Sequence, residues 1–190
     1  MRDPDPMASP HTPRPRPRAR RGRGSVTATT AVLMAVLMAL LTGCTGENVD
    51  ARQQLESRRS SAEAERDNLA LLTEVRAALS EVAPALQWRT PAPTVESGSL
   101  CKKPFDGVEG ATSQVLESGG ALGSIPDADW PRAWAAVKQV AAERGYGDEH
   151  TLKDEPGEHQ MSLYDEDGAE LSVGTGVITV ASIYGACHLE

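Results

Sequence analysis

One segment of the chain concentrates side chains that could bind a metal ion or carry acid–base chemistry. Residues 148–159, DEHTLKDEPGEH, contain His150, His159 and five carboxylates, among them Glu155. Imidazole nitrogens and carboxylate oxygens are ligands that zinc and other divalent ions accept. The spacing matches no H-E-x-x-H helix, and Pro156-Gly157 is incompatible with one. Two interpretations of His150, His159 and Glu155 remain: a metal site and, favoured, a solvated polar connection between a helix and a strand.

Other enzyme motifs are incomplete in this sequence. Residues 172–176, SVGTG, are rich in glycine like a phosphate loop, but the lysine and the following helix of a Walker motif are missing. No serine stands in a G-x-S-x-G elbow, and His188 has no evident base or nucleophile beside it. We therefore expect no catalytic residue and no cofactor, with a metal-dependent hydrolase of the cell wall, using the His150/His159 segment, as the alternative.

Cys44 stands at the end of a leader with the features of an export signal. The first 43 residues contain seven arginines, followed by an uncharged, largely apolar run from Ser25 to Gly43. The order Leu41-Thr42-Gly43-Cys44 resembles the bacterial lipobox, in which the cysteine receives a lipid and the leader is cleaved just before it. The apolar run is barely long enough to span a bilayer, so a permanent transmembrane anchor is the alternative. We expect residues 1–43 to be a signal peptide and Cys44 to be lipidated.

The two other cysteines, Cys101 and Cys187, would then lie in an oxidising extracytoplasmic space. Two cysteines in an exported domain pair far more often than they stay reduced. The loop that they close has 87 residues, for which chain entropy gives a stabilisation of at most about 4.5 kcal/mol. Neither has the C-x-x-C spacing of a redox pair. We therefore expect a structural disulfide, with a metal-binding or catalytic thiol as the alternative.

Charge restricts the partners of the mature chain. Without residues 1–43 the chain keeps 12 basic and 25 acidic residues, a net charge of −13. Such a domain repels nucleic acid and anionic head groups. We expect anchoring at the extracytoplasmic face of the cell membrane through the lipid on Cys44, an envelope protein or wall polymer as a further partner, and no nucleic-acid partner.

Apolar periodicity predicts two helices. Residues 44–66 are polar on nearly every face and predict a solvated helical or partly disordered stalk. An apolar stripe at steps of three and four then predicts a helix over residues 67–83 that docks on the domain and ends at Pro84. The clearest helix begins near Asp129 and stops at Gly145. Its predicted core residues include Trp130, Trp134 and Val137.

The C-terminal third changes to a twofold alternation, which indicates strands. Turn signals at Asp167-Gly168 and Gly174–Gly176 separate three predicted strands, at 160–164, 170–173 and 177–182, joined as an antiparallel meander. One predicted face carries Met161, Leu163, Leu171, Val173, Ile178, Val180 and Ser182, and the other carries Val177, Thr179 and Ala181.

Two further segments complete the predicted domain. A shorter strand is expected around residues 112–117, whereas the proline-rich segment 88–104 predicts a connecting loop or irregular edge strand that delivers Cys101. A helix laid on one face of an antiparallel sheet is a small two-layer α+β domain, which we expect over residues 67–190.

The layout resembles the LppA-like lipoproteins of high-GC Gram-positive bacteria. The likeness is carried by the lipobox, Cys101, the helix segment DWPRAWAAVKQVAAERGYG and the C-terminal DGAELSVGTGVITVASIYGACHL. It extends over roughly residues 85–190 and is one of pattern, without a catalytic motif. The resemblance implies a cell-envelope lipoprotein and carries over no site residue, because the family has no established activity.

Overall fold

The structure, a computed structural model, describes residues 46–190. The expected signal peptide, residues 1–43, and the expected lipidation site, Cys44, lie outside the described residues. Among the helices that are described, none is long and apolar enough to cross a membrane.

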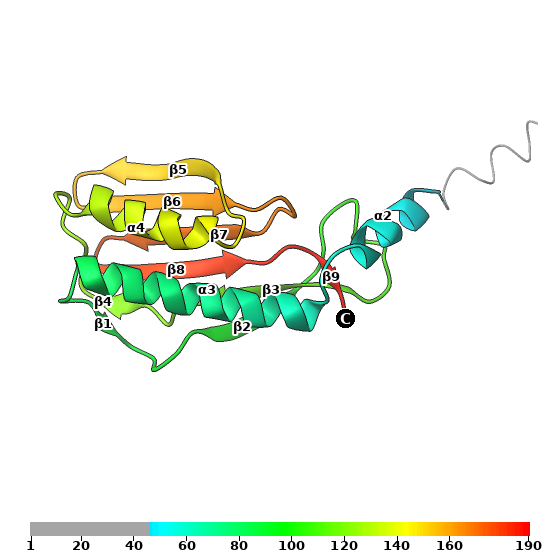
Figure 1. Ribbon diagram of the computed structural model, residues 1–190, viewed down its shortest axis with the longest axis horizontal. Coiled ribbons are helices and arrows are strands. Elements are labelled where there is room, and N and C mark those ends of the chain that lie inside the picture. Colours follow the sequence, from blue (N-terminus) through cyan, green and yellow to red (C-terminus); the bar gives the residue numbers. More distant parts are fainter. Residues whose placement is uncertain (1–45) are drawn as a thin grey trace, which may run out of the picture. The chain divides into compact units, whose positions relative to one another are not determined.

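Nine described strands form an antiparallel sheet (Figure 1). They are β1 (Gln87–Trp88), β2 (Thr94–Ser99), β3 (Ala111–Glu117), β4 (Ala121–Leu122), β5 (Asp148–Glu155), β6 (Glu158–Tyr164), β7 (Glu170–Thr175), β8 (Ile178–Tyr184) and β9 (His188–Leu189). The order is β1-β4-β8-β7-β6-β5, and β3 pairs with β8, β2 and β9. The predicted meander of β6, β7 and β8 is confirmed, as is the α+β fold class.

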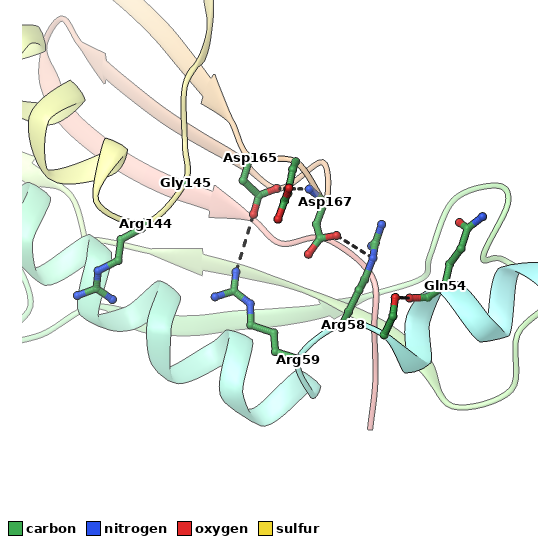
Figure 2. A pocket seen from close by; sticks show the side chains of 9 residues that line it. Gln54, Arg58, Arg59, Arg144, Gly145, Asp165 and Asp167 are labelled. Atoms are coloured by element: carbon green, nitrogen blue, oxygen red, sulfur yellow. Dashed lines mark hydrogen bonds and ion pairs between the residues drawn. The ribbon is translucent and has the colours of Figure 1, made fainter.

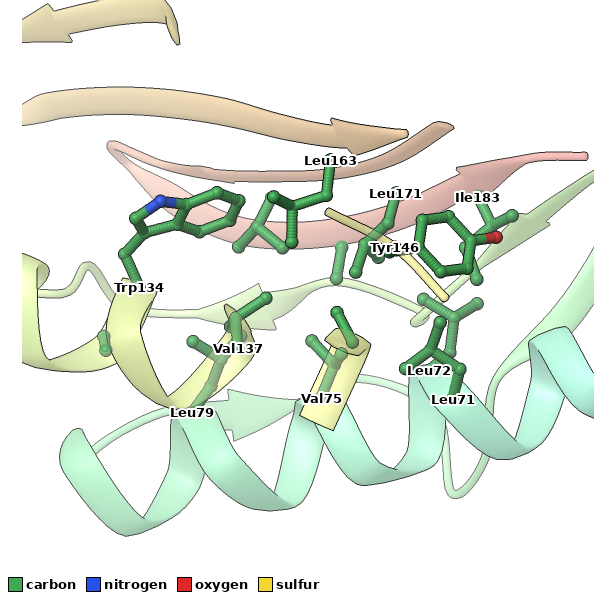
Figure 3. Packing of buried hydrophobic residues seen from close by; sticks show 14 of the residues in the cluster. Leu71, Leu72, Val75, Leu79, Trp134, Val137, Tyr146, Leu163, Leu171 and Ile183 are labelled. Carbon is green, nitrogen blue, oxygen red and sulfur yellow. The ribbon is translucent and has the colours of Figure 1, made fainter. Parts of the chain in front are cut away.

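Two helices cover one face of this sheet. They are α3 (Ser61–Val82) and α4 (Trp130–Ala142), which lie side by side over the strands (Figure 1). Figure 3 shows the core between the layers, where Val75, Val137 and Leu171 are fully buried. Burying this apolar area is the main favourable term in folding, at roughly 25 cal/mol per Å². No helix within residues 46–190 lies over the opposite face of the sheet.

Helix α3 begins at Ser61 rather than at the predicted residue 67. A capping box explains the earlier start: the Glu63 N–H donates to Ser60 Oγ at 3.3 Å, and the Ser60 N–H donates to Glu63 Oε2 at 2.9 Å. The same hydrogen bond from the Ser60 backbone is the first cause that lowers the pKa of Glu63.

The segment predicted as a solvated stalk is partly packed against the domain, which corrects that prediction. Residues 46–66 contain helix α2 (Gly46–Glu56) and the first turn of α3. Ala51 and Leu55 are only 2% and 1% exposed, and they form a small cluster with Val108. Because this partner lies about fifty positions away along the chain, the polar local pattern gave no sign of the contact.

The faces of β8 are opposite to those predicted. Ala181 and Ile183 are buried under the helices, opposite Val173 and Leu171 in the register. Ile178, Val180 and Ser182 therefore lie on the uncovered face, because the side-chain period of a strand is two. The tight turn after β7, where the Gly176 N–H donates to the Ile178 carbonyl, changes the phase of the alternation between the two strands.

Candidate functional site

His159 on β6 lies between two carboxylates and under an aromatic ring. Its Nδ1 is 2.6 Å from Asp154 Oδ1, and its Nε2 is 3.0 Å from Asp127 Oδ1. The ring stacks on Trp130 with centroids 5.1 Å apart. Asp127 also accepts the Gly157 N–H at 2.8 Å; this bond, followed by the one with His159, lowers the pKa of Asp127. His159 thus pins the β5–β6 turn to the loop that leads into α4.

His150 lies on the other face of the sheet. It stands opposite Ser162, on the uncovered side, where its ring meets the edge of Tyr164 and its Nε2 is 3.1 Å from Asp148. His159 points to the helix side, where Trp130 covers it. The alternative of a metal site that uses both His150 and His159 therefore gains no support, since strand alternation places the two imidazoles on opposite faces.

The remaining metal candidate is engaged elsewhere. Glu155 is exposed at the β5–β6 turn and lies 3.5 Å from Lys153 Nζ. Within residues 46–190, no group of three or more His, Cys, Asp or Glu side chains is placed to hold a metal ion. The segment 148–155, expected to be a solvated connection, is instead the edge strand β5, and Glu149 ties it to the domain by accepting a 2.7 Å hydrogen bond from Trp134 Nε1.

We expect His159→Ala to lower the free energy of unfolding by about 2 kcal/mol, because the substitution removes a buried ring that stacks on Trp130 and hydrogen-bonds to two carboxylates. Chemical denaturation monitored by tryptophan fluorescence measures the change. His150→Ala is the matched control: the same substitution on the exposed face should change stability by less than about 0.5 kcal/mol. Equal effects of the two variants would contradict the pinning role of His159.

The uncovered face of the sheet has small residues at its centre and larger ones around them. Ser162, Ser172 and Ser182 stand in one cross-strand row, and the next row holds Tyr164, Glu170 and Tyr184. Tyr184 is 52% exposed. Burial raises the pKa of Tyr164, and a hydrogen bond with Glu170 raises it further. A shallow hollow of about 460 Å³ continues this face past Gly174 and Val180.

A second hollow, of about 710 Å³, lies at the joint between α2 and α3 (Figure 2). Arg58 Nε is 2.9 Å from Asp167, and Arg59 is 3.8 Å from Asp165 and 2.9 Å from Asp67. Each of these guanidinium groups already faces a carboxylate. The arrangement fastens the joint to the β6–β7 turn, and only the paired arginines in the supposed stalk and the acidic turn DED could have indicated it from sequence.

The predicted disulfide between Cys101 and Cys187 is present. The two Cα atoms are 5.7 Å apart, within the range that a disulfide requires. The bond ties the loop after β2 to the segment between β8 and β9. Cys187 packs against the small cluster that includes Leu55 of α2.

His188 makes the stability of the domain depend on pH. It is buried, its Nδ1–H donates to the Arg59 carbonyl at 3.0 Å, and burial lowers its pKa below the usual 6.5. The unfolded chain therefore takes up this proton more readily than the folded one. Stability is retained above pH of about 6.5 and decreases as the pH falls from there through the lowered pKa of His188. We expect the melting temperature of His188→Gln to change less between pH 7 and pH 5.5 than that of the wild type.

Comparison with known proteins assigns the chain to a family. A family model described as LppA, a lipoprotein confined to pathogenic Mycobacterium, matches residues 41–190. The crystal structure of the lipoprotein LppA from Mycobacterium tuberculosis is similar in fold, with a TM-score of 0.52 and 19% identity over 76% of this chain and 88% of that chain. No curated protein matches. Because the family model matches well over half of its length, the chain belongs to the LppA lipoprotein family.

Proposed function

We propose that this lipoprotein is held at the extracytoplasmic face of the cell membrane by a lipid on Cys44 and acts there as a non-catalytic binding protein. The proposed binding surface is the uncovered face of the sheet, and the proposed ligand is a neutral polysaccharide of the wall. Support for the anchor comes from the lipobox and from the family match, which begins at Leu41 and so includes Cys44.

The observation that carries the binding role is the one-sided covering of the sheet. Helices α3 and α4 bury one face, while the other presents Gln160, Glu170 and Tyr184 around a floor of small residues. Amide, carboxylate and hydroxyl groups can hydrogen-bond to sugar hydroxyls, and an exposed tyrosine ring gives an apolar surface for a sugar ring. The net charge of −13 opposes an anionic polymer and so favours a neutral one.

The alternative of a metal-dependent hydrolase gains no supporting observation. His150 and His159 lie on opposite faces of the sheet. The hydrogen-bond partners of both imidazole rings are carboxylates of the protein itself.

Tyr184→Ala tests the binding surface. We expect the wild-type protein to sediment with purified, protein-free wall polysaccharide, and the variant to bind about fivefold more weakly, because the loss of an aromatic contact costs about 1 kcal/mol. The fraction that sediments over a range of polysaccharide concentrations gives the affinity.

The matched control is Gln139→Ala. Gln139 is exposed on α4, on the helix side of the sheet, and its replacement also leaves the net charge unchanged. This variant should bind like the wild type. Equal weakening by both substitutions, or no binding by the wild type, would exclude the uncovered face as a polysaccharide site.

A further inference from the structure

The uncovered face of the sheet ends in a further hollow of about 380 Å³, the end hollow. Its floor is the cross-strand row of Tyr164, Glu170 and Tyr184. The loop between β2 and β3 forms its side, with Leu100 and Phe105 among the lining residues. The volume lies within the range of about 300–1,000 Å³ that is typical of ligand pockets.

The end hollow lies one row of side chains away from the shallow hollow of the same face. Ser172 and Ser182 line the shallow hollow. Two positions along the same strands, Glu170 and Tyr184 line the end hollow. All four side chains point to the uncovered side, because the side-chain period of a strand is two. An extended polymer lying along β7 and β8 therefore reaches from the shallow hollow into the end hollow.

Arg58 ties together three segments that line the end hollow. Its guanidinium forms an ion pair with Asp167 at 2.9 Å (Figure 2) and lies 4.9 Å from the centre of the Phe105 ring. It also donates to the Cys187 carbonyl at 3.1 Å. Asp167, Phe105 and Cys187 all line the end hollow. The disulfide between Cys101 and Cys187 fixes the same loop a second time.

These joined segments stand past the last row of the face. Cys187 follows Tyr184 by three positions, where β8 has ended, and Asp167 lies in the turn between Tyr164 and Glu170. Arg58 itself is only 15% exposed and holds them together. A polymer that enters over the serine row therefore meets a closed end at this edge of the sheet.

The lining of the end hollow suits an uncharged ligand with apolar faces. Its charged residues are Lys102, Lys103, Asp167 and Glu170, which balance one another although the mature chain has a net charge of −13. Leu100, at the start of the loop, is 91% exposed. A leucine held in solvent beside a disulfide offers an apolar contact that a ligand can cover.

We propose that the end hollow binds the terminal unit of the neutral polysaccharide, so that the protein recognises chain ends and not the interior of the polymer. The proposal rests on the proposed function above, whose binding surface it extends. Leu100 packs on the terminal sugar ring, and the charged side chains of the lining hydrogen-bond to its hydroxyl groups. Arg58 is a positioning residue, because it holds the closed end in place without lining the end hollow.

Chain length separates recognition of ends from binding along the polymer. Purified, soluble, neutral wall polysaccharide is divided, and one part is shortened several-fold with mild acid. Isothermal titration calorimetry with the full mature chain then gives the amount of protein bound per gram at saturation. We expect this amount to rise by about the same factor as the number of chain ends. Binding to both samples with equal capacity per gram would overturn the proposal and leave the proposed function standing, whereas no binding to either would overturn both.

Leu100→Ala tests the place of end recognition. We expect this variant to bind the shortened polysaccharide about threefold more weakly than the wild type, because an apolar contact with the terminal ring is lost. Leu152→Ala is the matched control: Leu152 is also an exposed leucine, on β5, and it lines neither hollow of the uncovered face. The control should bind like the wild type. Unchanged affinity of Leu100→Ala, or equal weakening by both substitutions, would overturn the assignment of chain ends to the end hollow.

Discussion

Serine in place of Cys44 is expected to abolish lipidation and to leave the leader on the chain. The lipid is transferred to a thiol, and the less acidic serine hydroxyl does not supply an equivalent nucleophile. With no acyl chains, the protein loses about 0.8 kcal/mol of membrane affinity for each methylene that would have been buried. Incorporation of labelled palmitate and the mass of the chain in its own cell measure both effects.

The matched control for Cys44→Ser is Cys101→Ser, which removes a thiol in the folded domain and should still take up label. A wild-type chain that carries no fatty acid, or a Cys44→Ser chain that still does, would refute the assignment of Cys44. A wild-type chain that keeps residues 1–43 would instead favour the transmembrane anchor.

Replacement of both Cys101 and Cys187 by serine should lower the free energy of unfolding by up to about 4 kcal/mol. The bond closes a loop of 87 residues, and breaking it restores conformational entropy to the unfolded chain. This loss is a large part of the total, since the free energy of unfolding of a domain is typically only about 5–15 kcal/mol. Urea denaturation of the wild type, with and without reductant, and of the double variant measures the loss.

Reductant provides the internal control for this prediction. It should destabilise the wild type to the level of the double variant and leave the double variant unchanged. Titration of the denatured, unreduced protein should find no reactive thiol at Cys101 or Cys187. Two reactive thiols there would refute the disulfide in the exported protein.

Segments that bury one apolar face in the main core could be predicted from their periodicity, and segments without such a face could not. In helix α4 and in strands β6 and β7 the apolar residues recur with the period of each element, because one face of each is buried in the main core. The edge strand β5 is polar on both faces and was interpreted as a connection. Its hydrogen-bonding partner, β6, was predicted, but no apolar alternation indicated that β5 adds to it.

The candidate site depended on this missed strand. His150 and His159 are close in sequence, and a loop could have brought them together. Once β5 and β6 form a hairpin, the register fixes His150 on the uncovered face and His159 under Trp130. The pairing of Cys101 with Cys187 was predictable because it needed only the compartment and the number of cysteines.

The small cluster under α2 has a mechanical consequence. If the uncovered face of the sheet is bound to a rigid wall while the lipid stays in the membrane, any relative movement of wall and membrane pulls on α2 first. Among the described residues, the buried members of this cluster are Ala51, Leu55 and Val108, whereas α3 and α4 share the larger main core with the sheet. Elements with few buried contacts open at lower free energy than the global fold. Under tension α2 would detach from the domain first and lengthen the connection to the lipid, while the sheet stays folded. Helix α2 would then absorb the relative movement of wall and membrane.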